Sequence, residues 1–155
     1  MHAQHREARP EDAAGLLELV REFTALQTYP FDEPRMRRAL QQLLGSPELG
    51  RIWLIVDDGA AVGYVALTFG YSLEHGGRDA LIDELFVQPQ ARGRGLGRAA
   101  VVFALEQAAG LGANAVHLEV ERTNPSAHEL YRSLGFGGND RQLLTRRLRA
   151  PVGAG

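Results

Sequence analysis

Cysteine and lysine are both absent from this chain of 155 residues, so all 17 of its basic residues are arginine. Without cysteine the chain can form no disulfide, thiolate zinc site or iron–sulfur cluster, and it has no cysteine nucleophile. Without lysine it has no Schiff-base amine and lacks the lysine that holds phosphate in a P-loop. These absences exclude several large classes of enzyme. We attribute the all-arginine basic set, with much alanine and glycine, to genome composition.

An excess of charge of one sign is also missing, since 17 basic residues face 19 acidic ones for a net charge of −2. A nucleic-acid partner is therefore not expected. The longest apolar run, residues 99–105, is far shorter than the ~20 residues of a membrane helix. The polar N-terminus has no signal-peptide core. We expect a cytoplasmic protein with no membrane partner.

Apolar residues make up 45% of the chain, enough for one well-packed domain. We expect that domain to span residues 1–149, followed by a flexible tail at residues 150–155. Hydrophobic periodicity, Gly and Pro positions and helix-start signals predict a mixed α/β fold: an antiparallel meander, then a parallel crossover, with helices beside the sheet. The predicted helices span about 11–28, 33–44, 95–109 and a short segment from Asn124 to Gly135, and the predicted strands about 52–56, 61–71, 80–87, 115–121 and 143–148.

A glycine-rich loop at residues 88–97 precedes the apolar helix at about 95–109. Glycines expose backbone N–H groups there, and a helix start adds its dipole, so the loop favours an anion such as phosphate. Arg92, Arg94 and Arg98 supply charge suited to phosphate. The simpler alternative is that this segment only connects a strand to a helix, with its arginines in solvent and no bound phosphate.

A dinucleotide site of the Rossmann type is a second alternative, because residues 95–100 fit its glycine pattern and Glu119 stands near the expected acidic position. In that fold, however, the first glycine follows the strand almost at once. Here five residues, 88–92, intervene, and an antiparallel meander comes first. The Rossmann interpretation is therefore remote.

Two segments of the chain contain spaced residue patterns. Residues 85–97 contain Q-x-x-G-x-G, formed by Gln90, Gly93 and Gly95, and residues 124–136 read N-x-x-A-x-x-x-Y-x-x-x-G-F. The first pattern resembles the acetyl-CoA loop of the GNAT acyltransferase superfamily, Q/R-x-x-G-x-G/A, and the second resembles the second motif of that family. The resemblance covers about residues 80–136 and implies a GNAT-type mixed sheet and acetyl-CoA as co-substrate. The five histidines show no metal-ligand spacing, so we expect no metal.

The resemblance also implies which residues bind coenzyme A. The loop N–H groups would hold the pyrophosphate, and the strand end would pair with the pantetheine arm. The expected cofactor-binding residues are Leu85, Phe86, Val87, Gln90, Arg92, Gly93, Arg94, Gly95, Leu96, Gly97, Arg98 and Asn124.

Four residues are candidates for the chemistry. Tyr131 matches the tyrosine that often protonates the leaving thiolate in this family, although its helical stripe also suits ordinary core packing. For the base, Glu119 resembles the glutamate of N-terminal alanine acetyltransferases of ribosomal proteins. Asp83 resembles the position of a water-activating glutamate in diamine acetyltransferases, and Glu84 follows it but is expected on the other strand face. Each carboxylate could instead be solvated or attract a cationic amine.

The expected function is acetyl transfer from acetyl-CoA directly to a primary amine of a small molecule or peptide. A non-catalytic acyl-CoA sensor module is the alternative within the same fold. Asn124, which the resemblance assigns to cofactor binding, is equally suited to be the N-cap of the helix that begins at Pro125. Because many family members pair, a homodimer is also among the expectations.

Overall fold

The structure, a computed structural model, describes residues 3–149. The expected tail at residues 150–155 lies outside the described residues. The chain divides into two compact units, one that ends at Glu119 and one that begins at Val120, and we describe each by itself.

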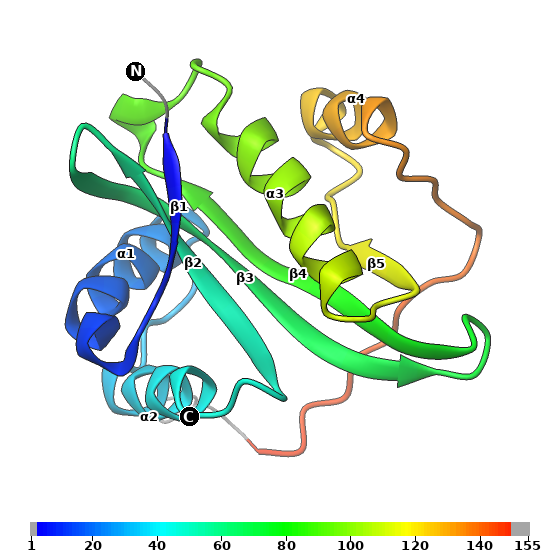
Figure 1. The fold of residues 1–155 in the computed structure, drawn as a ribbon, viewed down its shortest axis with the longest axis horizontal. Coiled ribbons are helices and arrows are strands. Elements are labelled where there is room, and N and C mark those ends of the chain that lie inside the picture. Colours follow the sequence, from blue (N-terminus) through cyan, green and yellow to red (C-terminus); the bar gives the residue numbers. More distant parts are fainter. Residues whose placement is uncertain (1–2, 150–155) are drawn as a thin grey trace. The chain divides into compact units, whose positions relative to one another are not determined.

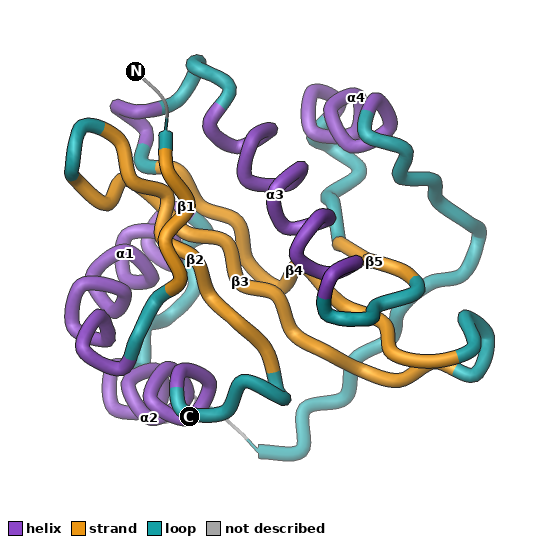
Figure 2. The backbone as a smooth tube through the Cα atoms, in the orientation of Figure 1, coloured by secondary structure: helices purple, strands orange, loops and turns teal. Residues whose placement is uncertain are grey.

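One mixed sheet forms the first unit, as predicted (Figures 1 and 2). The first four strands pair antiparallel, and the last runs parallel to its neighbour. The hairpin after Asp57 uses Asp58 and Gly59 at φ +49° and +79°, which suits the twist of paired strands. In sheet order the strands are β1 (Gln4–Glu7), β2 (Gly50–Asp57), β3 (Ala60–Ser72), β4 (Gly77–Val87) and β5 (Ala115–Leu118).

All four predicted helices form, with boundaries close to those expected. Asp32 caps one of them, because its side chain accepts a hydrogen bond from the Arg35 backbone N–H at 3.1 Å. No helix among residues 3–149 is long and apolar enough to cross a membrane. The helices are α1 (Ala13–Leu26), α2 (Glu33–Leu44), α3 (Leu96–Gly110) and α4 (Pro125–Ser133), with short 3-10 turns η1 (Pro10–Asp12) and η2 (Pro89–Ala91).

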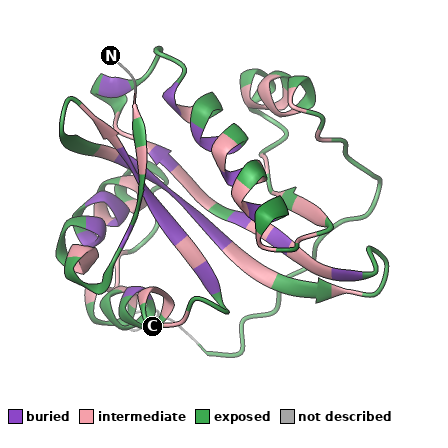
Figure 3. Ribbon diagram, in the orientation of Figure 1, coloured by how far each residue is buried: buried purple, intermediate pink, exposed green. Residues whose placement is uncertain are grey.

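Alternation along the strands divides the core between the two faces of the sheet. Figure 3 shows buried residues along the central strands and on the helices beside them. On one face, Leu16 and Val20 of α1 pack against β2 and β3, in one cluster with Tyr64. On the other face, Trp53 of β2 meets Phe103 of α3 edge to face, with ring centroids 5.5 Å apart. Helices therefore cover both faces, and α3 lies along β3 and β4.

Three predictions of secondary structure were wrong or incomplete. Strand β1 was missed, because its four polar residues, Gln4–Glu7, carry no apolar alternation. Strand β5 ends at Leu118, three residues before the predicted end at residue 121. No strand forms at 143–148, where Leu143, Leu144 and Leu148 are 74%, 81% and 88% exposed. Two of these leucines are adjacent rather than alternating, so they do not define one buried strand face.

Replacing Leu16 by alanine tests the core beneath α1, since its side chain is fully buried. We expect Leu16→Ala to lower the free energy of unfolding by about 2–5 kcal/mol, because it removes packing and leaves a cavity. Denaturant unfolding of this variant and of the matched Leu73→Ala checks it. Leu73 is 91% exposed, so its replacement should cost less than about 0.5 kcal/mol. Equal losses in the two variants would contradict this core assignment.

Candidate active site

The glycine loop leaves β4 at Val87, passes through η2 and enters α3 at Leu96. Gly93 and Gly95 adopt φ values of +79° and +76°, a left-handed conformation that side chains with a Cβ rarely take. Gly95 is also the N-cap of α3, and no side chain caps the helix. The local sequence therefore builds a tight turn that ends directly at a helix N-terminus.

Backbone donors are concentrated in this turn. No acceptor within residues 3–149 takes a hydrogen bond from the backbone N–H of any residue in the run 93–97. In a folded protein such donors are normally paired with protein, water or ligand. The loop thus offers a row of N–H groups together with the positive end of the α3 dipole, an arrangement that suits a phosphate group.

Arg92 and Arg94 of the loop contact other parts of the chain. Arg92 donates from Nε to the Val87 carbonyl at 2.8 Å, and Arg94 forms an ion pair with Asp57 of the β2–β3 hairpin. These contacts hold the loop against the end of the sheet. A direct contact between Arg92, Arg94 or Arg98 and a cofactor stays a prediction.

Glutamine side chains tie the same loop to α1. Gln90 donates to Gln88 Oε1 at 3.2 Å, and Gln88 donates to both carboxylate oxygens of Glu22 at 3.0 and 3.2 Å. The sequence alone did not reveal Gln88 or Glu22 as partners, since they stand 66 residues apart. Gln90, one of the three defined residues of the loop motif, therefore stabilises the loop by a hydrogen bond to another loop residue.

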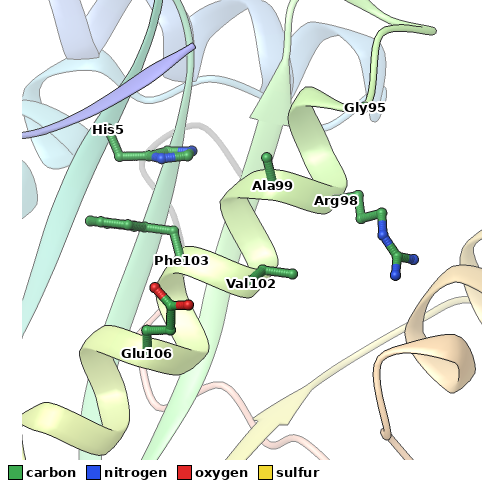
Figure 4. Close-up of a pocket in the computed structure, with 7 residues that line it drawn as sticks. All are labelled: His5, Gly95, Arg98, Ala99, Val102, Phe103 and Glu106. Carbon is green, nitrogen blue, oxygen red and sulfur yellow. The ribbon is translucent and has the colours of Figure 1, made fainter. Parts of the chain in front are cut away.

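A groove of about 430 Å³ lies beside α3, lined by His5 of β1 and by helix residues down to Glu106, and it begins at Gly95 of the loop (Figure 4). The His5 ring stacks on Phe103 at its floor, with centroids 4.5 Å apart and planes 15° apart. Burial lowers the pKa of His5, so its ring is mostly neutral at pH 7. Figure 4 shows the Arg98 side chain extending away from His5 and Phe103. Because Gly95 lines one end of the groove, the groove is continuous with the glycine loop.

Strand β4 contains an extra residue next to its carboxylates. Ala66 pairs with Glu84 while Leu67 pairs with Ile82, so Asp83 is left as a bulge. After the bulge Glu84 lies on the face of Tyr64, from which it accepts a hydrogen bond. The register and this hydrogen bond place Glu84 on the Tyr64 face, and the expectation that Asp83 lies on the opposite face stays a prediction.

Carboxylates gather where β4 and β5 separate. Beyond the pair of Ile82 with Leu118, no described strand pairs with this edge of β4. Partial burial and then the charge of Glu119 raise the pKa of Asp83. Burial also raises the pKa of Glu84, the Tyr64 hydrogen bond opposes that rise, and the charge of Asp83 adds to it. The structure thus brings three predicted base candidates, Asp83, Glu84 and Glu119, into one electrostatic group.

Tyr64 is the member of this group that the sequence did not reveal. Its hydroxyl donates to Glu84 Oε2 at 2.5 Å, although the ring is 1% exposed. Burial and the neighbouring carboxylates raise the pKa of Tyr64. In the sequence it is one apolar position of a strand, and only the register across the bulge shows its partner. Within residues 3–149, no group of three or more His, Asp or Glu side chains is placed to hold a metal ion.

The second unit carries the other two predicted residues. Asn124 caps α4, since its side chain accepts from the Ala127 N–H at 3.2 Å, which confirms the N-cap alternative. Tyr131 lies on α4, half-buried, with its ring 5.9 Å from that of Phe136. Burial raises the pKa of Tyr131, so its hydroxyl stays protonated at neutral pH. A cofactor contact of Asn124 and a catalytic role of Tyr131 stay predictions.

Comparison with known proteins adds a family match to this geometry. A model of the acetyltransferase (GNAT) family matches residues 16–136. Among solved structures, an integron cassette protein, HFX_CASS3, from the mobile metagenome of Cole Harbour Salt Marsh superposes with a TM-score of 0.86. It is 37% identical, and the match covers 96% of this chain and 93% of that one.

Two curated relatives carry acetyltransferase names. The peptidyl-lysine N-acetyltransferase YjaB of Salmonella typhimurium is 31% identical over 134 residues, which cover 84% of this chain and 81% of that protein. An uncharacterized N-acetyltransferase, MJ1207, of Methanocaldococcus jannaschii is 40% identical over 80 residues, 51% of this chain. The match covers only 35% of MJ1207, so the chain spans about a third of that relative.

The positive φ of Gly95 can be tested with a matched pair of alanine variants. We expect Gly95→Ala to lower the free energy of unfolding by about 1 kcal/mol, because alanine strains a left-handed residue. Gly97 lies in the first turn of α3 with open space around it, so Gly97→Ala should be neutral or stabilising by up to about 1 kcal/mol. Denaturant unfolding measures both, and an unaffected Gly95→Ala would contradict the loop geometry.

Proposed function

Because the chain belongs to the acetyltransferase (GNAT) family and is an N-acetyltransferase, we propose that it moves the acetyl group of acetyl-CoA directly to a primary amine of a small molecule or peptide. One observation carries this proposal: a negatively charged group of side chains and a positively polarised loop lie close together along β4. Asp83 and Glu84 stand within the strand, and the donor-rich loop follows its end.

Coenzyme A suits the loop because its phosphates carry the charge that the loop attracts. In this proposal the N–H groups of residues 93–97 bind the pyrophosphate. The edge of β4 from Leu85 to Val87 pairs with the amide groups of the pantetheine arm, since no described strand occupies that edge. Together the two features hold the thioester near the bulge.

A primary amine suits the carboxylate group. An alkyl amine is a cation at neutral pH, and Asp83, Glu84 and Glu119 supply negative charge to attract it. One of these carboxylates then accepts a proton from the ammonium group, which frees the lone pair for attack. The relative YjaB is named for peptidyl lysine, whose side chain ends in such an amine.

Transfer is direct in this proposal. The amine nitrogen attacks the thioester carbonyl, the carbon–nitrogen bond forms, and the carbon–sulfur bond breaks. Tyr131 gives its proton to the leaving thiolate, a role that its raised pKa permits because the hydroxyl is protonated when the thiolate forms. The chain has no cysteine, so no enzyme thiol carries the acetyl group.

The binding of acetyl-CoA and the release of thiol test the proposed function together. We expect calorimetry to detect acetyl-CoA but not NAD, and a screen of amines, antibiotics and peptides to release free thiol in step with acetylated amine. An absence of heat with acetyl-CoA would contradict the proposal. Binding without thiol release from any amine would favour the alternative, a non-catalytic acyl-CoA sensor.

The role of Tyr131 has its own prediction. We expect Tyr131→Phe to lower the turnover by about 10²–10⁴-fold, because it removes the proton donor. The affinity of the Tyr131→Phe variant for acetyl-CoA, measured by calorimetry, should stay close to that of the unmodified protein. The matched control is Tyr71→Phe, since Tyr71 is 76% exposed on β3 and should tolerate loss of its hydroxyl. A turnover unchanged by Tyr131→Phe would rule out this role.

A further inference from the structure

The Tyr64 hydroxyl is a polar group in the middle of an apolar core. Its ring lies against Phe23 of α1 and Phe86 of β4, with centroids 6.4 and 6.1 Å away. Burying a hydroxyl is costly unless it has a hydrogen-bond partner. Here the partner is Glu84 Oε2, at 2.5 Å. A phenylalanine would fill the same space without that cost, so the hydroxyl calls for an explanation.

We propose that Tyr64 is a positioning residue for acetyl transfer, and that Glu84, whose carboxylate it holds at the bulge, is the base. This inference rests on the proposed function and deepens it, because it selects one base from three candidates. Tyr64 need not touch substrate, and its effect passes entirely through Glu84.

Glu84 differs from the other two candidates in how firmly it is held. One of its oxygens is committed to Tyr64, and the other has no hydrogen-bond partner among the described residues. Neither Asp83 nor Glu119 has a hydrogen-bond partner among the described residues, so no such contact fixes either carboxylate. A base acts efficiently when its reactive oxygen is fixed relative to the substrate. The hydrogen bond provides that fixation for Glu84 alone.

The proton step then involves defined atoms. The ammonium group of the acceptor passes one proton to the open oxygen of Glu84, so the carboxylate becomes a neutral acid and the amine becomes neutral. The amine attacks the thioester, the carbon–sulfur bond breaks, and the sulfur takes a proton from the Tyr131 hydroxyl. A second proton leaves the new nitrogen as it becomes an amide, and solvent restores both side chains.

The surroundings of Glu84 determine how its charge responds to loss of the hydrogen bond. Tyr64 of β3 and Asp83 of β4 are the titratable groups that act on it, while α1 presents the apolar ring of Phe23 to Tyr64. Burial and Asp83 disfavour the carboxylate, and the Tyr64 hydrogen bond favours it. Tyr64 is itself protonated throughout the ordinary pH range, so it is always a donor. Removing this donor should raise the pKa of Glu84 further.

The pH dependence of kcat/KM for Tyr64→Phe tests the proposal. The assay uses acetyl-CoA and the lysine-containing peptide that gives the fastest thiol release with the unmodified protein. We expect the acidic limb of the profile to move to higher pH by about one unit, because one hydrogen bond to a charged group is lost. At high pH, where Glu84 is ionised in both proteins, the rate should return close to that of the unmodified protein.

Two further variants separate this role from a structural one. Tyr71→Phe, an exposed tyrosine on the same strand, should leave the profile unchanged. Glu84→Gln keeps an oxygen that accepts from Tyr64 but cannot take the proton. The plateau value of kcat/KM for Glu84→Gln should fall by about 10²–10⁴-fold. Adding Tyr64→Phe to Glu84→Gln should then cause no further shift of the pH profile.

Several results would overturn the proposal. An acidic limb that does not move in Tyr64→Phe, or an equal loss of rate at every pH, would leave Tyr64 with a packing role only. A plateau value of kcat/KM in Glu84→Gln equal to that of the unmodified protein would show that Glu84 is not the base. This result would contradict the proposal even if Tyr64→Phe did not fold. Failure of the unmodified protein to release thiol with any amine is a different result, which contradicts the proposed function and this inference together.

Discussion

The extra residue in β4 is the constraint on which the rest of the site depends. Because Asp83 has no partner in β3, the strand shifts its register, and Glu84 lies on the face where Tyr64 can bind it. Strand β5 pairs with β4 only up to Ile82, so no described strand pairs with β4 between the bulge and the glycine loop. The bulge thus places a half-buried carboxylate next to a stretch of β4 that has no described strand partner on this side.

Charge is separated along this short piece of chain although the whole protein is nearly neutral. Asp83 and Glu84 are acidic, and about ten residues later the loop supplies unpaired N–H groups, a helix N-terminus and arginines. In the proposed function this separation of charge attracts the cationic amine and the anionic cofactor to neighbouring positions. Arg94 shows that part of the basic charge also serves the fold, since its ion pair with Asp57 holds the loop to the hairpin. The absence of lysine means that such contacts rely on arginine alone.

The sequence predicted the antiparallel meander, the parallel crossover, the helices and the position of the glycine loop, because these depend on local periodicity and turn residues. It failed where partners distant in the chain decide the outcome. Strand β1 has no apolar pattern of its own and forms by pairing with β2. The hydrogen bond of Glu84 depends on the register with β3, and its partner Tyr64 stands 20 residues away. The apolar residues at 143–148 suggested a strand, but they are exposed because no described strand pairs with that segment.

Direct transfer requires the amine and the thioester to be bound side by side, and a conjugate of coenzyme A with a lysine side-chain amine measures this most directly. Calorimetry would compare the affinity of this bisubstrate conjugate with that of coenzyme A alone. We expect the conjugate to bind more tightly, and we expect Glu84→Gln to remove part of the gain because the carboxylate attracts the amine. A conjugate that binds no more tightly than coenzyme A would contradict an acceptor site beside the thioester, and with it the account of β4 as the strand that brings both substrates together.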